Sequence, residues 1–212
     1  MRAVLWDLDG TLVDTEPYWI ATEQALADEH GASWSHEHAM QLVGSDLLDS
    51  GRYIRDVMGL EMSPAEIVDY LLDGVVAKVQ EAVPWRPGAV ELLDSLRQKD
   101  IPCGLVTMSY QRFVAPIVAG LPPETFRVIV TGDQVERGKP HPEPYLTAAA
   151  ALGVEPGDCV AIEDSNTGAT SAEVAGCPVL VVENHVPVAP GARRTFASSL
   201  SGLTVEFLAG LA

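Results

Sequence analysis

The chain has 212 residues, of which 47% are hydrophobic and 20% are charged, and its formal net charge is −17. This composition excludes a disordered chain, and it argues against nucleic acids and anionic membranes as partners, because both require clustered lysine and arginine. No apolar stretch reaches the roughly 18 residues that span a bilayer, and the three cysteines have no metal-like spacing. We therefore expect a cytoplasmic protein with buried, reduced cysteines.

The first fourteen residues, MRAVLWDLDGTLVD, organise the rest of the chain. Ala3 to Trp6 predicts a buried strand that delivers Asp7 and Asp9 onto a glycine turn. Side chains two residues apart on an extended segment face the same way, so these carboxylates would repel each other. A bound divalent cation, or a proton on one carboxylate, would remove this repulsion, so the motif suggests a site for a charged ligand. The alternative interpretation is an ordinary polar turn after an edge strand.

Residues 15–84 predict helices without a convincing strand between them. Pro17 suits the first turn of a helix that runs to His30, before Gly31 ends it. We therefore assign residues 15–84 to a helical cap domain, and residues 1–14 and 85–212 to a core domain. The further helices predicted in the cap run from the N-cap Ser35 to Gly44, from the N-cap Asp46 to Gly59, and from the capping box at Ser63 and Glu66 to about Ala82.

Helices and strands alternate after residue 88. The strands are nearly continuous runs of valine, isoleucine and leucine, which is typical of a parallel sheet covered on both faces. We predict an α/β fold with a doubly wound parallel sheet, whose edge is closed by the tail from Pro187 to Ala212. The predicted helices cover residues 89–99, a segment ending near 119, 143–152 and 167–175, and the predicted strands cover 102–106, 127–130, 159–162 and 179–182.

Polar residues collect where these strands end. Thr107 follows the second strand, Glu163 and Asp164 follow the fourth, and Lys139 lies in the loop after the third. Each has an ordinary explanation by itself: a strand-end hydroxyl, a solvated loop lysine, or carboxylates that cap the next helix. Ligands of open parallel sheets bind beyond the carboxyl ends of the strands, so the joint occurrence favours one site.

This group of side chains suits a phosphoryl group and Mg²⁺. Two acidic pairs without a histidine or cysteine cluster form a hard, oxygen-rich site, and a lysine with a threonine hydroxyl can hold phosphate oxygens. Asp7, if its pKa stays near the ordinary ~3.9, is ionised and can attack phosphorus. Asp9 can then protonate the leaving alcohol and later accept a proton from water.

Four sequence motifs carry a family resemblance. DLDGTLVD at 7–14, VTMS at 106–109, GKPHPEPY at 138–145 and IEDSNTGATSAEVAG at 162–176 together resemble the motifs of the haloacid dehalogenase-like hydrolase superfamily. The helical insertion resembles the cap of the subgroup that includes phosphoglycolate phosphatase, β-phosphoglucomutase and many sugar-phosphate phosphatases.

The resemblance implies a role for each site residue. Met108 departs from the family pattern, since relatives often have a small polar residue there, and we expect only its backbone amide to bind phosphate. By this resemblance, Asp7 would be the nucleophile and a metal ligand, and Asp9 would catalyse proton transfer and bind Mg²⁺ through its backbone carbonyl. Thr107 would bind phosphate, and Lys139 would neutralise the negative charge of Asp7 and the phosphate. Asp164 would bind Mg²⁺ directly, and Glu163 would do so directly or through water.

These features together predict a Mg²⁺-dependent phosphatase that hydrolyses a small phosphate monoester through an aspartyl-phosphate intermediate. Dehalogenation has no leaving alcohol to protonate, so Asp9 points to phosphate esters. The alternatives are a phosphomutase of the β-phosphoglucomutase type and a non-catalytic, receiver-like phosphate-binding module. Such mutases usually carry a histidine and an arginine in two stretches that here read Pro17-Tyr18-Trp19 and Gly44-Ser45-Asp46-Leu47-Leu48. Neither residue is present in this chain, which favours transfer of the phosphoryl group to water over transfer to a second sugar.

The predicted cap is strongly acidic. It contains thirteen aspartates and glutamates but only Arg52, Arg55 and Lys78 as cations. A second anion on the substrate would meet repulsion there, within the short range that salt allows. We therefore expect the substrate to be a small metabolite with one phosphate on a neutral moiety. We also expect the protein to be a monomer. Trp19 would contact that moiety, unless it only packs within the cap.

Overall fold

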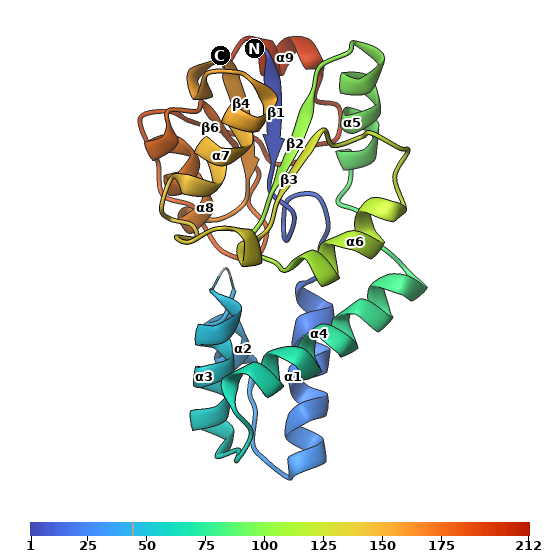
Figure 1. Cartoon of the computed structure of the whole chain (residues 1–212), viewed down its shortest axis with the longest axis vertical. Coiled ribbons are helices and arrows are strands. Elements are labelled where there is room, and N and C mark those ends of the chain that lie inside the picture. Colours follow the sequence, from blue (N-terminus) through green and yellow to red (C-terminus); the bar gives the residue numbers. More distant parts are fainter. Residues whose placement is uncertain (44) are drawn as a thin grey trace.

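The protein, as a computed structural model, is described for residues 1–43 and 45–212. Its centre is a six-stranded, wholly parallel sheet with the strand order β3-β2-β1-β4-β5-β6 (Figure 1). The chain builds one half of the sheet outward from β1 and then returns beside β1 to build the other half, which confirms the predicted α/β class. The strands are β1 (Ala3–Trp6), β2 (Cys103–Val106), β3 (Val128–Val130), β4 (Cys159–Glu163), β5 (Val179–Val181) and β6 (Arg194–Phe196).

Alternation along β1 divides the core into two layers. Val4 and Trp6 face one apolar cluster, while Ala3 and Leu5 face the other, because successive side chains of a strand point to opposite sides. Helices cover both clusters, so β1, β2 and β5 are buried along their whole length and contain no polar side chain. Helices α5 (Ala89–Gln98), α6 (Gln111–Ala119) and α9 (Val205–Ala209) pack in the first layer, and α7 (Glu143–Leu152) and α8 (Asn166–Ala175) pack in the second.

The insertion after β1 consists of helices, as predicted. The side chain of Asp46 accepts hydrogen bonds from two backbone amides at the start of its helix, and Ser63 with Glu66 forms the expected capping box. The second helix ends at Met40, earlier than predicted, and its predicted end, Gly44, lies outside the described residues. The helices are α1 (Glu16–His30), α2 (His36–Met40), α3 (Leu47–Met58) and α4 (Pro64–Glu81).

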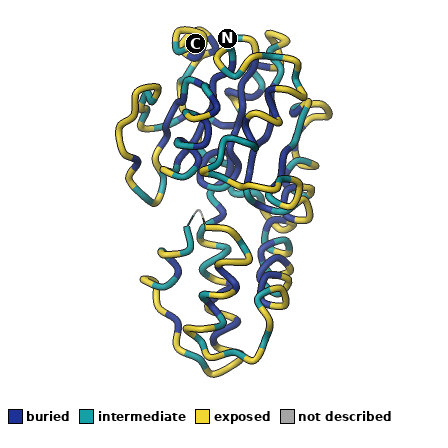
Figure 2. The backbone as a smooth tube through the Cα atoms, turned by 60° about the vertical axis from the view of Figure 1, so that its left-hand side comes forward, coloured by how far each residue is buried: buried dark blue, intermediate teal, exposed yellow. Residues whose placement is uncertain are grey.

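Helix α4 joins the insertion to the sheet-bearing part of the molecule. On one side, Ile67 and Leu71 pack in a small cluster with residues of the other three insertion helices. On the other side, Val68, Leu72, Val75 and Val79 belong to the cluster that covers the sheet. Figures 1 and 2 show the helices as a separate lobe, whose buried faces turn inward, beyond the edge of the sheet where the strands end.

The two chain crossings between the lobes are paired. Val13 forms an antiparallel bridge with Trp85, the amide of Asp14 donates to Pro84 O at 2.8 Å, and the amide of Arg86 donates to Leu12 O at 3.0 Å. The insertion therefore leaves and re-enters at one hydrogen-bonded point.

The C-terminal tail closes the sheet, and its elements were not predicted individually. Strand β6 pairs with β5 as the last strand, and Val205 and Leu208 of α9 are buried in the first layer. A three-residue strand beginning with arginine and threonine gives too little apolar pattern to identify. Within the described part of the chain, no helix is long and apolar enough to cross a membrane.

Candidate active site

A buried lysine connects the ends of three strands. The ammonium of Lys139 donates to Asp7 Oδ1 at 2.7 Å, to Glu163 Oε1 at 2.6 Å and to the carbonyl of Val106 at 2.9 Å. The exposed fraction of the Lys139 side chain is 3%, that of Asp7 is 11% and that of Glu163 is zero. Burial disfavours the charge of Lys139, but Asp7 and Glu163 outweigh it and raise the pKa of the ammonium. The lysine is therefore a fixed positive charge at the strand ends.

Three carboxylates surround this charge. Asp7, Glu163 and Asp164 each offer an oxygen, and these oxygens lie within 4.8 Å of one another. Burial and the neighbouring acids raise the pKa of Asp164 well above its ordinary value, and burial raises the pKa of Asp7 to about 7 despite Lys139. The expected ordinary pKa of Asp7 is therefore wrong for the protein alone. One ammonium leaves excess negative charge buried, so this oxygen-only donor set fits a hard divalent cation such as Mg²⁺.

Glu163 lies beneath the site and is fully hydrogen-bonded. Its Oε1 accepts from the hydroxyl of Tyr145 at 2.7 Å as well as from Lys139, and its Oε2 accepts from Ser165 Oγ at 3.2 Å. Gly168 of α8 allows this arrangement, because a Cβ at that position would overlap the Glu163 carboxylate. Glu163 thus orients Lys139, and it has little free capacity to bind anything else.

Asp9 is held by two hydroxyl groups. Thr15 Oγ1 donates to Asp9 Oδ1 at 2.5 Å, and Ser109 Oγ donates to Asp9 Oδ2 at 2.6 Å. Burial raises the pKa of Asp9, although these hydrogen bonds partly oppose the rise. Gly10, at φ +85°, makes the turn that follows Asp7 and Asp9, and it leaves room for Asp164, whose carboxylate a Cβ would overlap. Burial thus shifts the pKa of Asp9 in the direction that a general acid requires.

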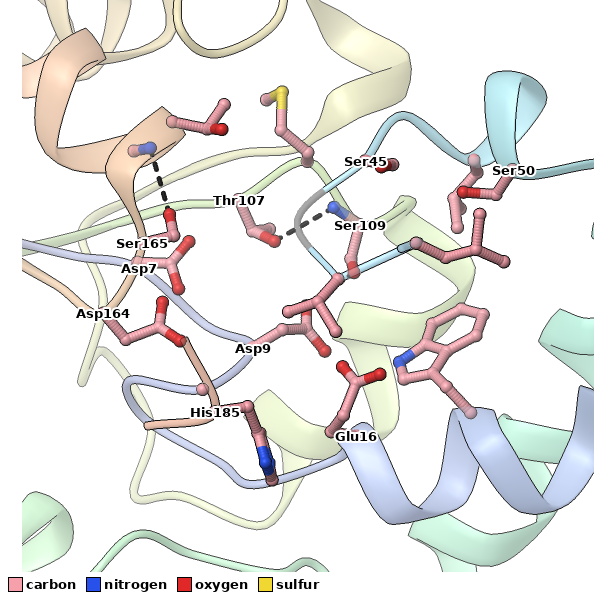
Figure 3. A pocket seen from close by; sticks show the side chains of 18 of the residues that line it. Asp7, Asp9, Glu16, Ser45, Ser50, Thr107, Ser109, Asp164, Ser165 and His185 are labelled. Atoms are coloured by element: carbon pink, nitrogen blue, oxygen red, sulfur yellow. Dashed lines mark hydrogen bonds between the residues drawn. The ribbon is translucent and has the colours of Figure 1, made fainter. Parts of the chain in front are cut away.

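Thr107 and Met108 follow β2 at the same edge. Figure 3 shows Thr107 beside Asp7, and its Oγ1 accepts a hydrogen bond from the amide of Ser109 at 3.0 Å. The Met108 sulfur accepts from the amide of Lys139 at 3.1 Å. We had expected only the backbone of Met108 to act, whereas its side chain also holds the loop that carries Lys139.

A cavity of about 120 Å³ lies over these groups, which is the liquid volume of roughly four water molecules. Its walls come from both lobes. Of the residues selected from the sequence, Asp7, Asp9, Trp19, Thr107, Met108, Lys139 and Asp164 line it, and Glu163 does not. The Trp19 ring also lies 5.5 Å from the Phe113 ring of α6, so Trp19 both lines the cavity and packs between the lobes.

Sequence reasoning missed several residues of the site. Tyr145 stood in a quoted motif but received no role, and Thr15 and Ser109 were not recognised as partners of Asp9. Glu16 and Glu23 also line the cavity from α1. Their spacing of seven residues, which puts two side chains on one face of a helix, was the available signal.

The comparisons with known proteins agree with this geometry. Residues 4–182 match the family model described as haloacid dehalogenase-like hydrolase. N-acetylmuramic acid 6-phosphate phosphatase from Pseudomonas aeruginosa is 35% identical over 189 residues, which cover 86% of this chain and 81% of that protein. Hexitol phosphatase A from Escherichia coli is 34% identical over 191 residues, covering 85% and 82%.

A solved structure extends the match to the whole fold. CbbY from Rhodobacter sphaeroides, crystallised in complex with phosphate, superposes with a TM-score of 0.86 at 27% identity, covering 98% of this chain and 99% of that one. With the family model matching most of the chain and curated relatives above 30% identity, the chain belongs to the haloacid dehalogenase-like hydrolase family.

Proposed function

We propose that this phosphatase hydrolyses a small phosphate monoester with one phosphate on an uncharged moiety, through a phosphorylated Asp7. The observation that carries the proposal is the bridge that Lys139 makes between Asp7 and Glu163, beside Asp164, at the floor of a small cavity. A lysine and carboxylates converging there can hold a phosphate next to an aspartyl oxygen.

The reaction would proceed in two steps. An Asp7 oxygen attacks phosphorus, the bond from phosphorus to the alcohol oxygen breaks, and that oxygen takes the proton of Asp9. Water then attacks the phosphorus of the acyl phosphate and gives a proton to Asp9, which restores both carboxyl groups. Lys139 offsets the repulsion between the two anions, and Thr107 with the Met108 amide holds the phosphate oxygens.

Mg²⁺ would be held by Asp7, Asp164 and the backbone carbonyl of Asp9. When bound, the ion supplies charge neutralisation for the phosphoryl oxygens. Glu163 already accepts three hydrogen bonds, which supports an indirect role for it in Mg²⁺ binding, either by orienting Lys139 or through a water molecule. The raised pKa of Asp7 supports the same assignment, because a nearby cation favours the ionised carboxylate that the attack requires.

We further propose that residues 15–84 act as a cap domain on a core of residues 1–14 and 85–212. The insertion has an apolar cluster of its own, and its crossings near Thr15 and Trp85 are short and paired. A cap that closes over the site excludes water while the substrate reacts. The paired crossings would serve as hinges.

Transfer to water is favoured over transfer to a second sugar. The stretch where mutases usually have a histidine reads Pro17-Tyr18-Trp19, and none of these side chains has a basic nitrogen. The cap wall of the cavity therefore offers no imidazole from α1 to activate a sugar hydroxyl.

Phosphate release from p-nitrophenyl phosphate tests the proposal. Wild-type protein with MgCl₂ should release inorganic phosphate, EDTA should stop the release, and Asp7→Asn should abolish it. Asp94→Asn, a matched charge change on the exposed surface of α5, should keep wild-type activity. Undiminished release by Asp7→Asn, or in EDTA, would refute the mechanism.

A further inference from the structure

Glu23 is a buried acid that the proposed reaction does not use. It lies on α1, its exposed fraction is 3%, and it lines the cavity. Its Oε2 accepts a hydrogen bond from the indole nitrogen of Trp34 at 3.1 Å. Its other oxygen, Oε1, has no hydrogen-bond partner among the described residues. A carboxylate that is buried and only half satisfied costs stability, so its retention calls for an explanation.

The exposed part of Glu23 faces the cavity. Only 3% of the residue surface is exposed. Because Glu23 lines the cavity and is otherwise enclosed, this exposed part opens to the cavity.

Glu23 lies about two helical turns beyond Glu16, on the same face of α1. Glu16, at the start of α1, points toward Asp9 (Figure 3). Glu23 follows seven residues later, and a rise of roughly 1.5 Å per residue puts it roughly 10 Å further along the helix. A phosphate held at Asp7 would thus leave Glu23 near the far end of a hexose-sized or hexitol-sized leaving group, beyond the reach of a triose-sized one.

The walls around Glu23 favour hydroxyl groups over anions. The cap contributes apolar side chains and two serines to the cavity, and Lys139 is the only lysine or arginine among the described lining residues. Its ammonium already serves the strand ends. Burial raises the pKa of Glu23 to about 7 and that of Glu16 to about 8. Above these values both groups are carboxylates, which accept a hydrogen bond from a hydroxyl group and repel a second carboxylate.

We propose that Glu23 is a specificity-determining residue, which accepts a hydrogen bond from a hydroxyl at the end of the leaving group far from the phosphate. This inference rests on the proposed function and deepens it. It assigns the substrate to polyhydroxy chains of hexose or hexitol length, without a carboxylate.

The test compares two substrates of different length in matched variants. The probes are sorbitol 6-phosphate and glycerol 3-phosphate, with p-nitrophenyl phosphate as the measure of basal chemistry. The assays run at pH 8.5, above the pKa of about 7 of Glu23, so that its carboxylate is ionised. In Glu23→Gln, which keeps an acceptor for Trp34, kcat/KM for sorbitol 6-phosphate should fall about tenfold, because a hydrogen bond to a charged acceptor becomes a neutral one. The values for the other two substrates should stay within about twofold.

Asp28→Asn is the matched control, since it removes the same charge from an exposed position of the same helix. It should leave all three substrates unchanged. An equal fall for every substrate in Glu23→Gln would mean a structural role only and would overturn the assignment, as would a wild-type enzyme that does not prefer the longer probe. If wild-type protein released no phosphate from p-nitrophenyl phosphate with MgCl₂, the proposed function itself would fail.

Discussion

Replacing Lys139 with methionine removes the only cation from the strand-end cluster while keeping most of the side-chain volume. The ammonium makes three hydrogen bonds, two of them to buried carboxylates. Removing one partner of a buried ion pair costs about 3–5 kcal/mol, because the remaining charge stays buried without compensation. We expect the unfolding free energy of Lys139→Met to fall by that amount at pH 8 in EDTA.

The loss should depend on pH in a defined direction. The pKa of Asp7 is already raised to about 7 by burial, and without Lys139 it rises further, whereas the unfolded chain has an ordinary value near ~3.9. A carboxyl group whose pKa is raised by folding lowers stability as the pH increases from the unfolded value through the folded one. At pH 5.5 the group is largely protonated, so the loss should be smaller by on the order of 1–2 kcal/mol.

Urea denaturation at both pH values measures these changes, with Lys99→Met as the control. Lys99 pairs with Glu206 on the exposed surface, where solvent screening leaves such pairs little effect on stability. An unfolding free energy of Lys139→Met within about 1 kcal/mol of wild type at pH 8 would refute the reasoning. A loss that is equal at both pH values would refute the proposed charge state of Asp7.

Three further predictions concern the acid, the packing under the site and the metal. Asp9→Asn should lower kcat for an alkyl phosphate by about 10²–10⁴, and less for p-nitrophenyl phosphate, whose leaving group needs little protonation. Steady-state rates with both esters check this, and equal losses would contradict it. Gly168→Ala should destabilise the protein by about 1–3 kcal/mol in urea, because its Cβ overlaps Glu163. Gly157→Ala should match wild type, because its Cβ would meet only Gly176 O, at an ordinary contact distance of 3.9 Å. Mg²⁺ at about ten times its Kd should add about 1.4 kcal/mol of stability, seen as a higher Tm. Asp164→Asn should remove that rise, and a variant that keeps it would exclude Asp164 as a ligand.

The sequence was informative where short-range physics decides the structure. Asp46 and Ser63 predict the starts of two helices, because their side chains can accept hydrogen bonds from the backbone amides of the first turn. The observed helices begin directly after these residues. The carboxyl ends of parallel strands lie at the same edge of a sheet, so the strand pattern in the sequence predicts that Asp7 and Lys139 lie close together. The structure puts their side chains in direct contact.

The remaining features depend on contacts between distant residues. Tyr145 becomes a site residue only because α7 packs under the sheet and brings its hydroxyl to Glu163. The pKa of Asp7 depends on how completely water is removed, which no local pattern encodes. The partner of the Met108 sulfur is likewise set by the path of a loop thirty-one residues away.

The pairing of Val13 with Trp85 has a consequence for how such enzymes diversify. Since the two ends of the insertion are neighbours, a different module with adjacent ends could occupy the same place without shifting β1 or the carboxylates behind it. Under the proposed function, the residues for bond cleavage and those for choice of metabolite would lie in separate stretches of the sequence. The helices beyond the crossing are free to change their lining residues, Glu23 among them, while the strand ends stay as they are.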